Sequence, residues 1–362
     1  MTASTRVSRE QVLRFRVAAQ QLDRRGRHRD AAVLDLGVQD TGPDGARWAL
    51  ELRGASVPAD ELVLAWTLRG APHAYRRSEV AQVAAAVAPW SEDDAAKRIF
   101  DAARQLKRAG IPVLDALDHL AGEMRDIAAK PVVKGEMSGA LTERLDAPYL
   151  RWCNPCQATH PYEQPFRISA LQAGLELEPG TSPPVLRRIP RWRGAATTVP
   201  DHLDPVRAVL RLLGPVSPKQ VAAYVDSPVR DVKERWPEDV VPVEVEGAAL
   251  DVLADDLDAL VDPPATDAVR LLGPFDLFLQ CRDRELVVPS AAARTELWRT
   301  IGRPGGVLVG GEVVGFWRPR SRGKRLRLAV TVWDGRPGPG GVAEQAERLA
   351  AFRGQAFDGF EQ

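Results

Sequence analysis

The segment from Val206 to Glu246 constrains the fold more than any other part of the chain. VRAVLRLLG has apolar residues at helical spacing and ends at Gly214, and Ser217 followed by Pro218 is typical of the start of a second helix. After a turn at Asp226, VRDVKERW predicts a third helix and VVPVEVEG a strand with a glycine turn. This is the element order of a winged helix-turn-helix, a module that binds DNA in most proteins and another protein in some.

The N-terminal region follows a similar order. Ser8 and Gln11 have the spacing of a capping box, and the apolar residues behind them predict a helix over residues 9–24. A short helix around residues 32–34 and a glycine-rich turn at residues 41–45 follow. WALELRG and LVLAWTLRG then predict two strands, so this region indicates another winged helix.

The rest of the chain separates into a helical and a β-rich region. Helical patterns run from Ser91 to Lys130, and EMSGALTERLD with PYLRW predicts a further helix and strand. After Pro263, GGVLVGGEVVGFW and RLRLAVTVW predict antiparallel strands, and VAEQAERLAAFRGQ predicts a helix that closes the chain. We therefore expect an α+β chain with winged-helix domains at residues 1–90, 91–195 and 200–262 and a C-terminal β-rich domain at residues 263–362.

Charge is balanced over the whole chain but uneven along it. The 49 Lys and Arg residues equal the 49 Asp and Glu residues, which excludes a bulk polycation. Basic segments occur at residues 1–30, 179–200 and 318–327, whereas DVLADDLDALVDPPATD (Asp251–Asp267) predicts an exposed acidic helix that leads into a linker. The basic segments are expected to form either a face for a phosphate backbone or ordinary solvated surface.

Two features of the sequence bear on the compartment. No apolar run approaches the roughly 20 residues that a bilayer requires, and MTASTRVSREQ lacks the apolar stretch of a signal peptide. The three cysteines are too few for a disulfide framework in a chain of 362 residues. We expect a cytoplasmic, nucleoid-associated protein.

Cys153, Cys156 and His160 have a spacing found among zinc ligands. A structural zinc site needs a fourth ligand, for which Cys281 and Glu163 are the candidates. The alternative is a pair of reduced, partly buried thiols, and no metal is assigned from the sequence. The chain also has no GxGxxG and no P-loop, so neither a nucleotide nor any other cofactor is expected.

Four blocks of the sequence resemble those of the AlkZ-like tandem winged-helix DNA glycosylases. They are LDLGVQDTGPDGARWALELRGA, WTLRGAPHAY, LLGPFDLFLQCRDR and GRPGGVLVGGEVVGFWRPR, in the same order over nearly the whole chain. The resemblance implies a C-shaped protein, with three winged-helix units and a β-rich C-terminal region, that wraps double-stranded DNA. It also implies a monofunctional glycosylase that removes bulky N-alkylated purines, including those of azinomycin-type interstrand crosslinks.

The family's catalytic motif is a glutamine, an apolar residue and a second glutamine or an aspartate, at a helix end near the N-terminus. Gly37-Val38-Gln39 corresponds to it here, so a glycine replaces the first polar side chain. The resemblance implies that Gln39 positions water on the anomeric carbon, with Asp40 or Asp35 as an assisting carboxylate. The alternative is that Gln39 and Asp40 cap the following turn.

Besides the arginines of the basic segment 179–200, two segments are candidates for DNA contact. RGAPHAYRR resembles a lesion-proximal element and is expected on a loop, and WRPRSRGKRLRL is expected to form a hairpin that enters a groove or follows phosphates. No acid lies near the six cations of the second segment in the sequence, which favours an anionic partner over a solvated hairpin. The candidates are His73, Tyr75, Arg76, Arg77, Arg188, Arg191, Arg193, Arg318, Arg320, Arg322, Lys324 and Arg325.

Three functions are compatible with these features. The first is a DNA glycosylase that acts on bulky alkylpurine adducts. The second is a non-catalytic winged-helix DNA-binding protein, either a lesion sensor or a transcriptional regulator, which Gly37 favours. The third is a protein-interaction scaffold. Because a regulator usually pairs its DNA-reading heads by dimerising, the monomer that we expect favours repair.

Overall fold

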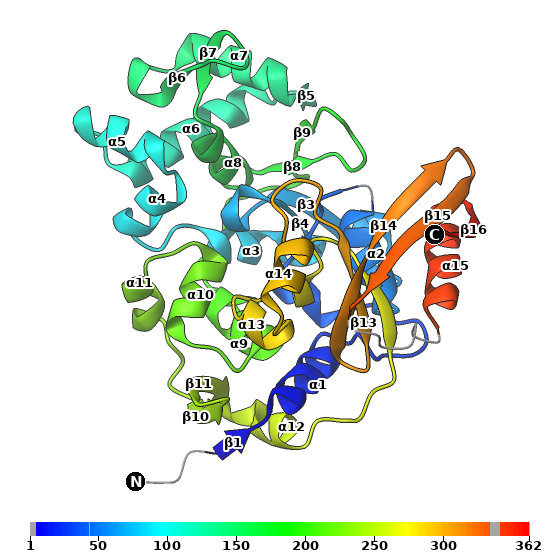
Figure 1. Cartoon of the computed structure of the whole chain (residues 1–362). Coiled ribbons are helices and arrows are strands. Elements are labelled where there is room, and N and C mark those ends of the chain that lie inside the picture. The colour runs from blue at the N-terminus through cyan, green and yellow to red at the C-terminus, as the bar shows by residue number, and fades with distance from the viewer. Residues whose placement is uncertain (1–4, 43, 334–340, 362) are drawn as a thin grey trace. The chain divides into compact units, whose positions relative to one another are not determined.

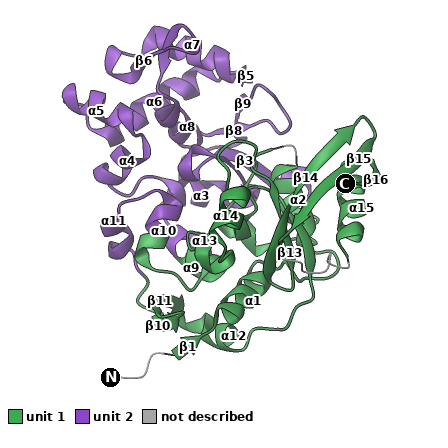
Figure 2. Cartoon of the chain, viewed as in Figure 1, with its two compact units in different colours: residues 1–57, 207–221, 237–362 green, residues 58–206, 222–236 purple. Residues whose placement is uncertain are grey.

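The computed structural model describes residues 5–42, 44–333 and 341–361 (Figure 1). The chain forms two compact units (Figure 2). Unit 1 consists of Met1–Val57, Arg207–Val221 and Pro237–Gln362, and unit 2 consists of Pro58–Val206 and Ala222–Trp236. The units are interleaved along the chain, whereas the four expected domains are consecutive, and those domains stay a prediction.

A small sheet in unit 1 contains the predicted wing-like hairpin. Strands β10 (Val240–Val245) and β11 (Ala248–Leu253) pair in antiparallel register around Glu246 and Gly247, and β1 (Thr5–Val7) pairs with β10 in parallel. Helix α1 (Arg9–Ala19) starts at the predicted capping box of Ser8 and Gln11. It buries its apolar face against this sheet and α12 (Leu257–Val261).

The second sheet of unit 1 confirms the β-rich C-terminal region. Its five strands have the order β12-β13-β14-β15-β16, antiparallel except for the last pair. Helix α15 (Val342–Phe352) packs against β12 and β16, and the chain ends with β16, not with the predicted final helix. The strands are β12 (Val269–Leu272), β13 (Gly305–Val309), β14 (Glu312–Arg322), β15 (Arg325–Val332) and β16 (Ala356–Phe360).

Buried arginines connect the N-terminal helices of unit 1 with its C-terminal half. Arg53, at the end of α2 (Gly45–Leu52), forms a two-pronged ion pair with Asp276 at 2.8 and 2.9 Å, and both side chains are fully buried. Arg16 of α1 pairs with Asp283 in the same manner at 2.6 and 3.0 Å. These pairs join segments that are more than 200 residues apart in the sequence.

Unit 2 is mainly helical, as the sequence predicts from Ser91 onward. Helix α7 (Lys134–Arg144) and strand β6 (Leu150–Cys153) confirm the predicted helix and strand of EMSGALTERLD and PYLRW. Helices α6, α7 and α8 share an apolar core with β8 and β9. The helices are α3 (Val80–Val87), α4 (Glu92–Arg98), α5 (Asp101–Arg108), α6 (Val113–Ile127), α7, α8 (Glu163–Gln172) and α11 (Val229–Glu234).

The strands of unit 2 form short pairs and one small sheet. Antiparallel hairpins join β3 (Leu62–Trp66) with β4 (Pro72–Arg76) and β6 with β7 (Ala158–Pro161). The sheet has the order β5-β9-β8. Its strands are β5 (Val132–Val133), β9 (Val185–Arg188) and β8 (Leu175–Leu177).

Two local predictions were wrong. WALELRG forms most of helix α2 and not a strand, because Trp48, Ala49 and Leu52 all pack inward on a helix, where Trp48 donates to the Leu271 carbonyl at 2.8 Å. The predicted acidic helix begins as strand β11 and becomes helical only at residue 254. The predicted short helix around residues 32–34 forms as a 3₁₀-helix, Ala32–Asp35, with no side-chain cap.

The predicted helix-turn-helix elements occur in the expected order. Helices α9 (Pro205–Leu213), α10 (Pro218–Val225) and α11 are followed by β10 and β11. The tandem winged-helix arrangement itself stays a prediction. Among the described residues, no helix is both long and apolar enough to cross a membrane.

We predict that Asp276→Asn lowers the free energy of unfolding by about 3 to 5 kcal/mol, because it leaves the Arg53 charge buried without a counterion. Urea unfolding followed by circular dichroism measures the change. Asp93→Asn, which removes the partner of an exposed arginine, Arg230, is the control and is expected to shift the midpoint little. Equal effects of both substitutions would contradict the prediction.

Candidate functional site

The segment that carries Gln39 is held in one conformation by its backbone. After the 3₁₀ turn of residues 32–35, Gly37 adopts a φ of +85° and leads into β2 (Val38–Gln39). Because a left-handed φ is strained for residues with a side chain, position 37 suits glycine. Val38 is buried, and Gln39 is half-buried on the next position of the strand.

Thr41, which was not predicted from the sequence, is a polar partner of Gln39. Gln39 Nε2 donates to Thr41 Oγ1 at 3.0 Å, so two polar side chains two positions apart lie together. The signal was present in the sequence as the spacing of two polar residues on one face of an extended segment. The partner of Gln39 therefore lies two residues after it, at position 41, and not two residues before it, at position 37.

Asp40 and Asp35 both have structural partners. Asp40 Oδ1 accepts a hydrogen bond from the Ala46 backbone at 2.8 Å, at the start of α2. A Cβ on Gly45 would lie 2.0 Å from that oxygen, so the close approach requires glycine. Asp35 pairs with Arg211 at 3.0 Å. Both carboxylates therefore hold the backbone around Gln39, as the capping alternative for Asp40 predicts.

His73 and Tyr75 were expected on a loop, and the structure places them in strand β4. Both side chains are buried, with exposed fractions of 0% and 1%. Thr67 Oγ1 lies 3.0 Å from His73 Nδ1 and 2.9 Å from the Tyr75 hydroxyl. Burial, assisted by the positive charge of Arg69, lowers the pKa of His73 to about 3, and burial raises the pKa of Tyr75. Neither side chain reaches the surface in this structure.

The candidate arginines of unit 2 differ in how many ion pairs and hydrogen bonds they form within the protein. Arg76 pairs with Glu79 at 3.1 Å, and Arg77 pairs with Glu176 at 2.7 Å while also donating to two carbonyls. Arg188, Arg191 and Arg193 are exposed, although Arg188 also donates to the Arg125 carbonyl at 2.6 Å.

The predicted basic hairpin forms from β14 and β15 (Figure 1). The expectation that its cations have no acid nearby is wrong, because β16 pairs with β15 and brings two acids from the C-terminal end of the chain. Arg320 pairs with Glu361 at 3.2 Å, and Asp358 lies 3.8 Å from Arg325 and 3.7 Å from Arg327. Among the described residues, Arg322 and Lys324 at the exposed tip have no such pair within 4.0 Å.

A loop that the sequence analysis missed lies beside this hairpin. Ile301 is 89% exposed, between Arg299 and Arg303, and Arg318 of β14 donates to the Gly302 carbonyl at 3.3 Å. An isoleucine in a basic, glycine-rich turn is the signal that could have identified it. An exposed apolar side chain among cations is typical of wedges that enter DNA grooves.

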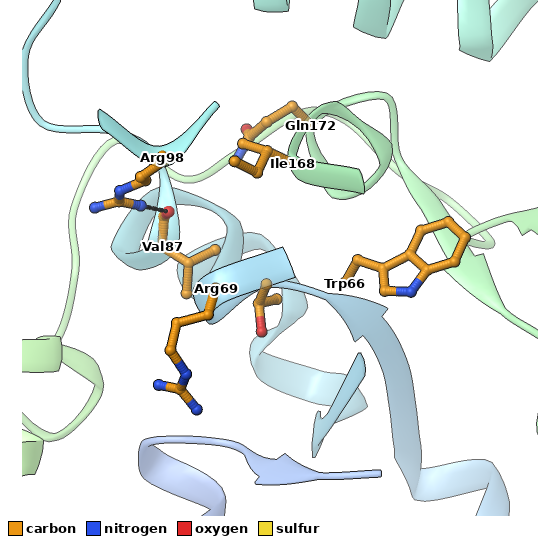
Figure 3. Close-up of a pocket in the computed structure, with 7 residues that line it drawn as sticks. Trp66, Arg69, Val87, Arg98, Ile168 and Gln172 are labelled. Atoms are coloured by element: carbon orange, nitrogen blue, oxygen red, sulfur yellow. Dashed lines mark hydrogen bonds between the residues drawn. The ribbon is translucent and has the colours of Figure 1, made fainter. Parts of the chain in front are cut away.

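Two hollows of unit 2 are small. Trp66, Arg69 and Arg98 are among the residues that line a hollow of about 10 Å³, in which Arg98 donates to the Val87 carbonyl at 2.8 Å (Figure 3). A second hollow between α5 and α6 has the same volume. Each has room for about one water molecule and neither could hold a purine base.

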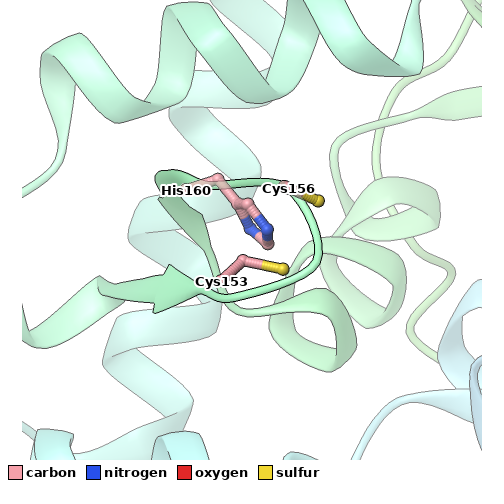
Figure 4. Close-up of side chains that lie close together, drawn as sticks. All are labelled: Cys153, Cys156 and His160. Atoms are coloured by element: carbon pink, nitrogen blue, oxygen red, sulfur yellow. The ribbon is translucent and has the colours of Figure 1, made fainter.

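Cys153, Cys156 and His160 come together at the end of the β6–β7 hairpin (Figure 4). A hydrogen bond from the Cys156 backbone lowers the pKa of Cys153 to about 7. The two candidates for a fourth ligand are engaged elsewhere. Glu163 is held by Lys134 and Arg167, and Cys281 is buried within unit 1.

The comparisons with known proteins agree with this architecture. The model of the AlkZ-like DNA glycosylase family matches residues 33–352, and the chain belongs to this family. Among solved structures, that of Streptomyces sahachiroi DNA glycosylase AlkZ is similar, with a TM-score of 0.74 and 20% sequence identity over 99% of this chain and 100% of that one. Among curated proteins, none matches the chain.

The buried His73 makes a testable contribution to acid stability. Its folded pKa of about 3 lies below its unfolded value near 6.5, so its contribution is complete above pH 6.5 and is lost as the pH falls toward 3. Between pH 6.5 and 4.5 the wild type is expected to lose about 2 to 3 kcal/mol more than His73→Asn. Urea unfolding at each pH measures this difference, and parallel curves for both proteins would contradict it.

Proposed function

We propose that this protein is a DNA glycosylase that hydrolyses the N-glycosidic bond of bulky N-alkylated purines in duplex DNA, including interstrand crosslinks. The single observation that carries the catalytic assignment is the paired Gln39 and Thr41 on a fixed turn within the region matched to the family. The substrate class follows from the resemblance noted in the sequence. We expect the enzyme to work as a monomer without a nucleotide cofactor.

The chemistry requires little from the protein beyond positioning. An N-alkylated purine is a cationic leaving group, and the sugar develops positive charge as the bond breaks. The protein must therefore hold a water molecule against the anomeric carbon. The hydrogen bond from Gln39 Nε2 to Thr41 orients the amide, and in our proposal the amide oxygen Oε1 accepts a hydrogen bond from that water. Asp40 and Asp35 act by holding the segment in place.

The surface that would hold DNA is the tip of the β14–β15 hairpin together with the Ile301 loop. Arg322 and Lys324 supply exposed charge for phosphates, and Ile301 supplies an apolar wedge beside Arg318, further down the same hairpin. The exposed Arg188, Arg191 and Arg193 are proposed as further phosphate contacts. We propose a role within unit 2 for His73 and Tyr75, because both side chains are buried.

A non-catalytic DNA-binding protein is the second candidate. Gly37 favours it, because the position that corresponds to the family's first catalytic residue has no side chain and a left-handed backbone. The presence of Thr41 beside Gln39 favours the enzyme.

We predict that Gln39→Ala lowers the rate of base release from duplex DNA carrying N7-alkylguanine by roughly 100-fold or more, since the water loses its positioning group. Thr41→Val is expected to lower it about tenfold, because one orienting hydrogen bond is lost. Gln105→Ala, a half-buried glutamine of α5, is the matched control and should retain the wild-type rate.

Release of base by Gln39→Ala at the wild-type rate would remove Gln39 from the mechanism. If the wild type releases nothing but binds duplex DNA with steep salt dependence, the protein is a binding module.

Neutralising the hairpin tip tests the DNA surface. Arg322→Gln with Lys324→Gln is expected to reduce the slope of log binding constant against log salt concentration by about 2 units, one for each lost phosphate contact. Fluorescence anisotropy with a labelled duplex measures it. Lys107→Gln with Arg108→Gln, two exposed cations of α5, is the control pair and should leave the slope unchanged. An unchanged slope for the tip variant would place the DNA elsewhere.

A further inference from the structure

The end of the β6–β7 hairpin brings three soft metal ligands together. The strands pair as far as Cys153 and Ala158, and the turn between them carries Cys156. The two Sγ atoms and a ring nitrogen of His160 all lie within 4.8 Å of one another (Figure 4). A tetrahedral zinc ion, with Zn–S of about 2.3 Å and Zn–N of about 2.0 Å, separates such ligands by roughly 3.5 to 3.8 Å, so a small contraction would enclose one ion.

The protonation of His160 suits a metal ligand. Nδ1 lies 2.8 Å from the Pro161 carbonyl oxygen, which can only accept, so the proton belongs on Nδ1. Nε2 then carries the lone pair. Metal-binding histidines commonly donate their other ring N–H to a carbonyl in this manner, which fixes both the tautomer and the ring orientation.

Among the described residues, the end of the hairpin is ordered by a few local hydrogen bonds, such as those that Trp152 and Gln157 donate to Asn154. The hairpin is a two-stranded sheet, which is marginally stable by itself, and only its base packs against α7 and the neighbouring core. Residues 154–159 are exposed, Trp152 is 58% exposed, and Gln157 has a left-handed φ of +50°. Small elements without an apolar core are commonly held by a disulfide or a metal ion.

We propose that the chain binds one Zn²⁺ ion through Cys153 Sγ, Cys156 Sγ and His160 Nε2, with a water molecule as the fourth ligand. Water fills that position because the oxygens of Glu163 are held by Lys134 and Arg167 and because Cys156 faces solvent. Binding forms two Zn–S bonds and one Zn–N bond, displaces waters from the hydrated ion and releases the remaining thiol protons to solvent. The ion clamps the end of the hairpin and orders the turn that follows Trp152. This inference does not depend on the proposed glycosylase activity.

The test uses the purified full-length protein under reducing conditions. Elemental analysis is expected to give about one zinc per chain, and titration of the zinc-free protein with Co²⁺ should produce a thiolate-to-cobalt charge-transfer band. Cys153→Ser, Cys156→Ser and His160→Gln should each bind Co²⁺ at least tenfold more weakly. Cys281→Ala and His119→Gln are matched controls, a cysteine and a histidine outside the cluster, and should bind as the wild type does.

A second measurement keeps the test independent of variants that fail to fold. Removing zinc from the wild type with a chelator should make the hairpin more sensitive to limited proteolysis while circular dichroism shows the remaining fold unchanged. Absence of the charge-transfer band in the reduced wild type, or undiminished binding by the cysteine variants, would overturn the proposal. So would a Cys153–Cys156 disulfide whose reduction restores no metal binding.

Discussion

The buried ion pair between Arg53 and Asp276 is the interaction on which unit 1 depends. All five N–H groups of the guanidinium have acceptors: the Asp276 carboxylate, the Ala49 carbonyl, and the carbonyl and side-chain oxygens of Gln20. Asp276 also accepts from the Phe278 backbone, and Gln20 donates to the Leu212 carbonyl. A charge with no water around it is tolerated only when it is fully paired in this manner. The network therefore specifies how α1, α2 and the segment before β13 pack together.

This network joins two of the sequence blocks that resemble the family. Arg53 belongs to the block that also contains Gln39, and Asp276 belongs to LLGPFDLFLQCRDR. The second buried pair, from Arg16 to Asp283, reaches the same distal block. The segment of the candidate catalytic residue is thus built on a scaffold closed by residues far along the chain, which a local pattern could not reveal.

Periodicity predicted the elements whose apolar residues pack locally. The β13–β14–β15 strands and the β10–β11 hairpin follow from alternation around glycine turns, and α7 from its helical spacing. The prediction of a strand at WALELRG was wrong because a short apolar run is compatible with either a strand or a buried helix. The contact of Trp48 with Leu271 decides between them. The prediction that His73 lies on a loop was wrong because its polar neighbours, Thr67 and Tyr75, come from the β3–β4 hairpin. The register of that hairpin does not follow from the sequence.

The parallel pairing of β16 with β15 brings acidic residues beside the basic β14–β15 hairpin. Asp358 and Glu361 neutralise part of the charge that Arg320, Arg325 and Arg327 would present to a polyanion. A protein that searches long stretches of undamaged DNA must release each site quickly, and a weaker electrostatic grip shortens the time spent at each one. In the proposed DNA complex, Asp358 and Glu361 compete with phosphates for these arginines, which lowers the affinity and shortens the residence at each site.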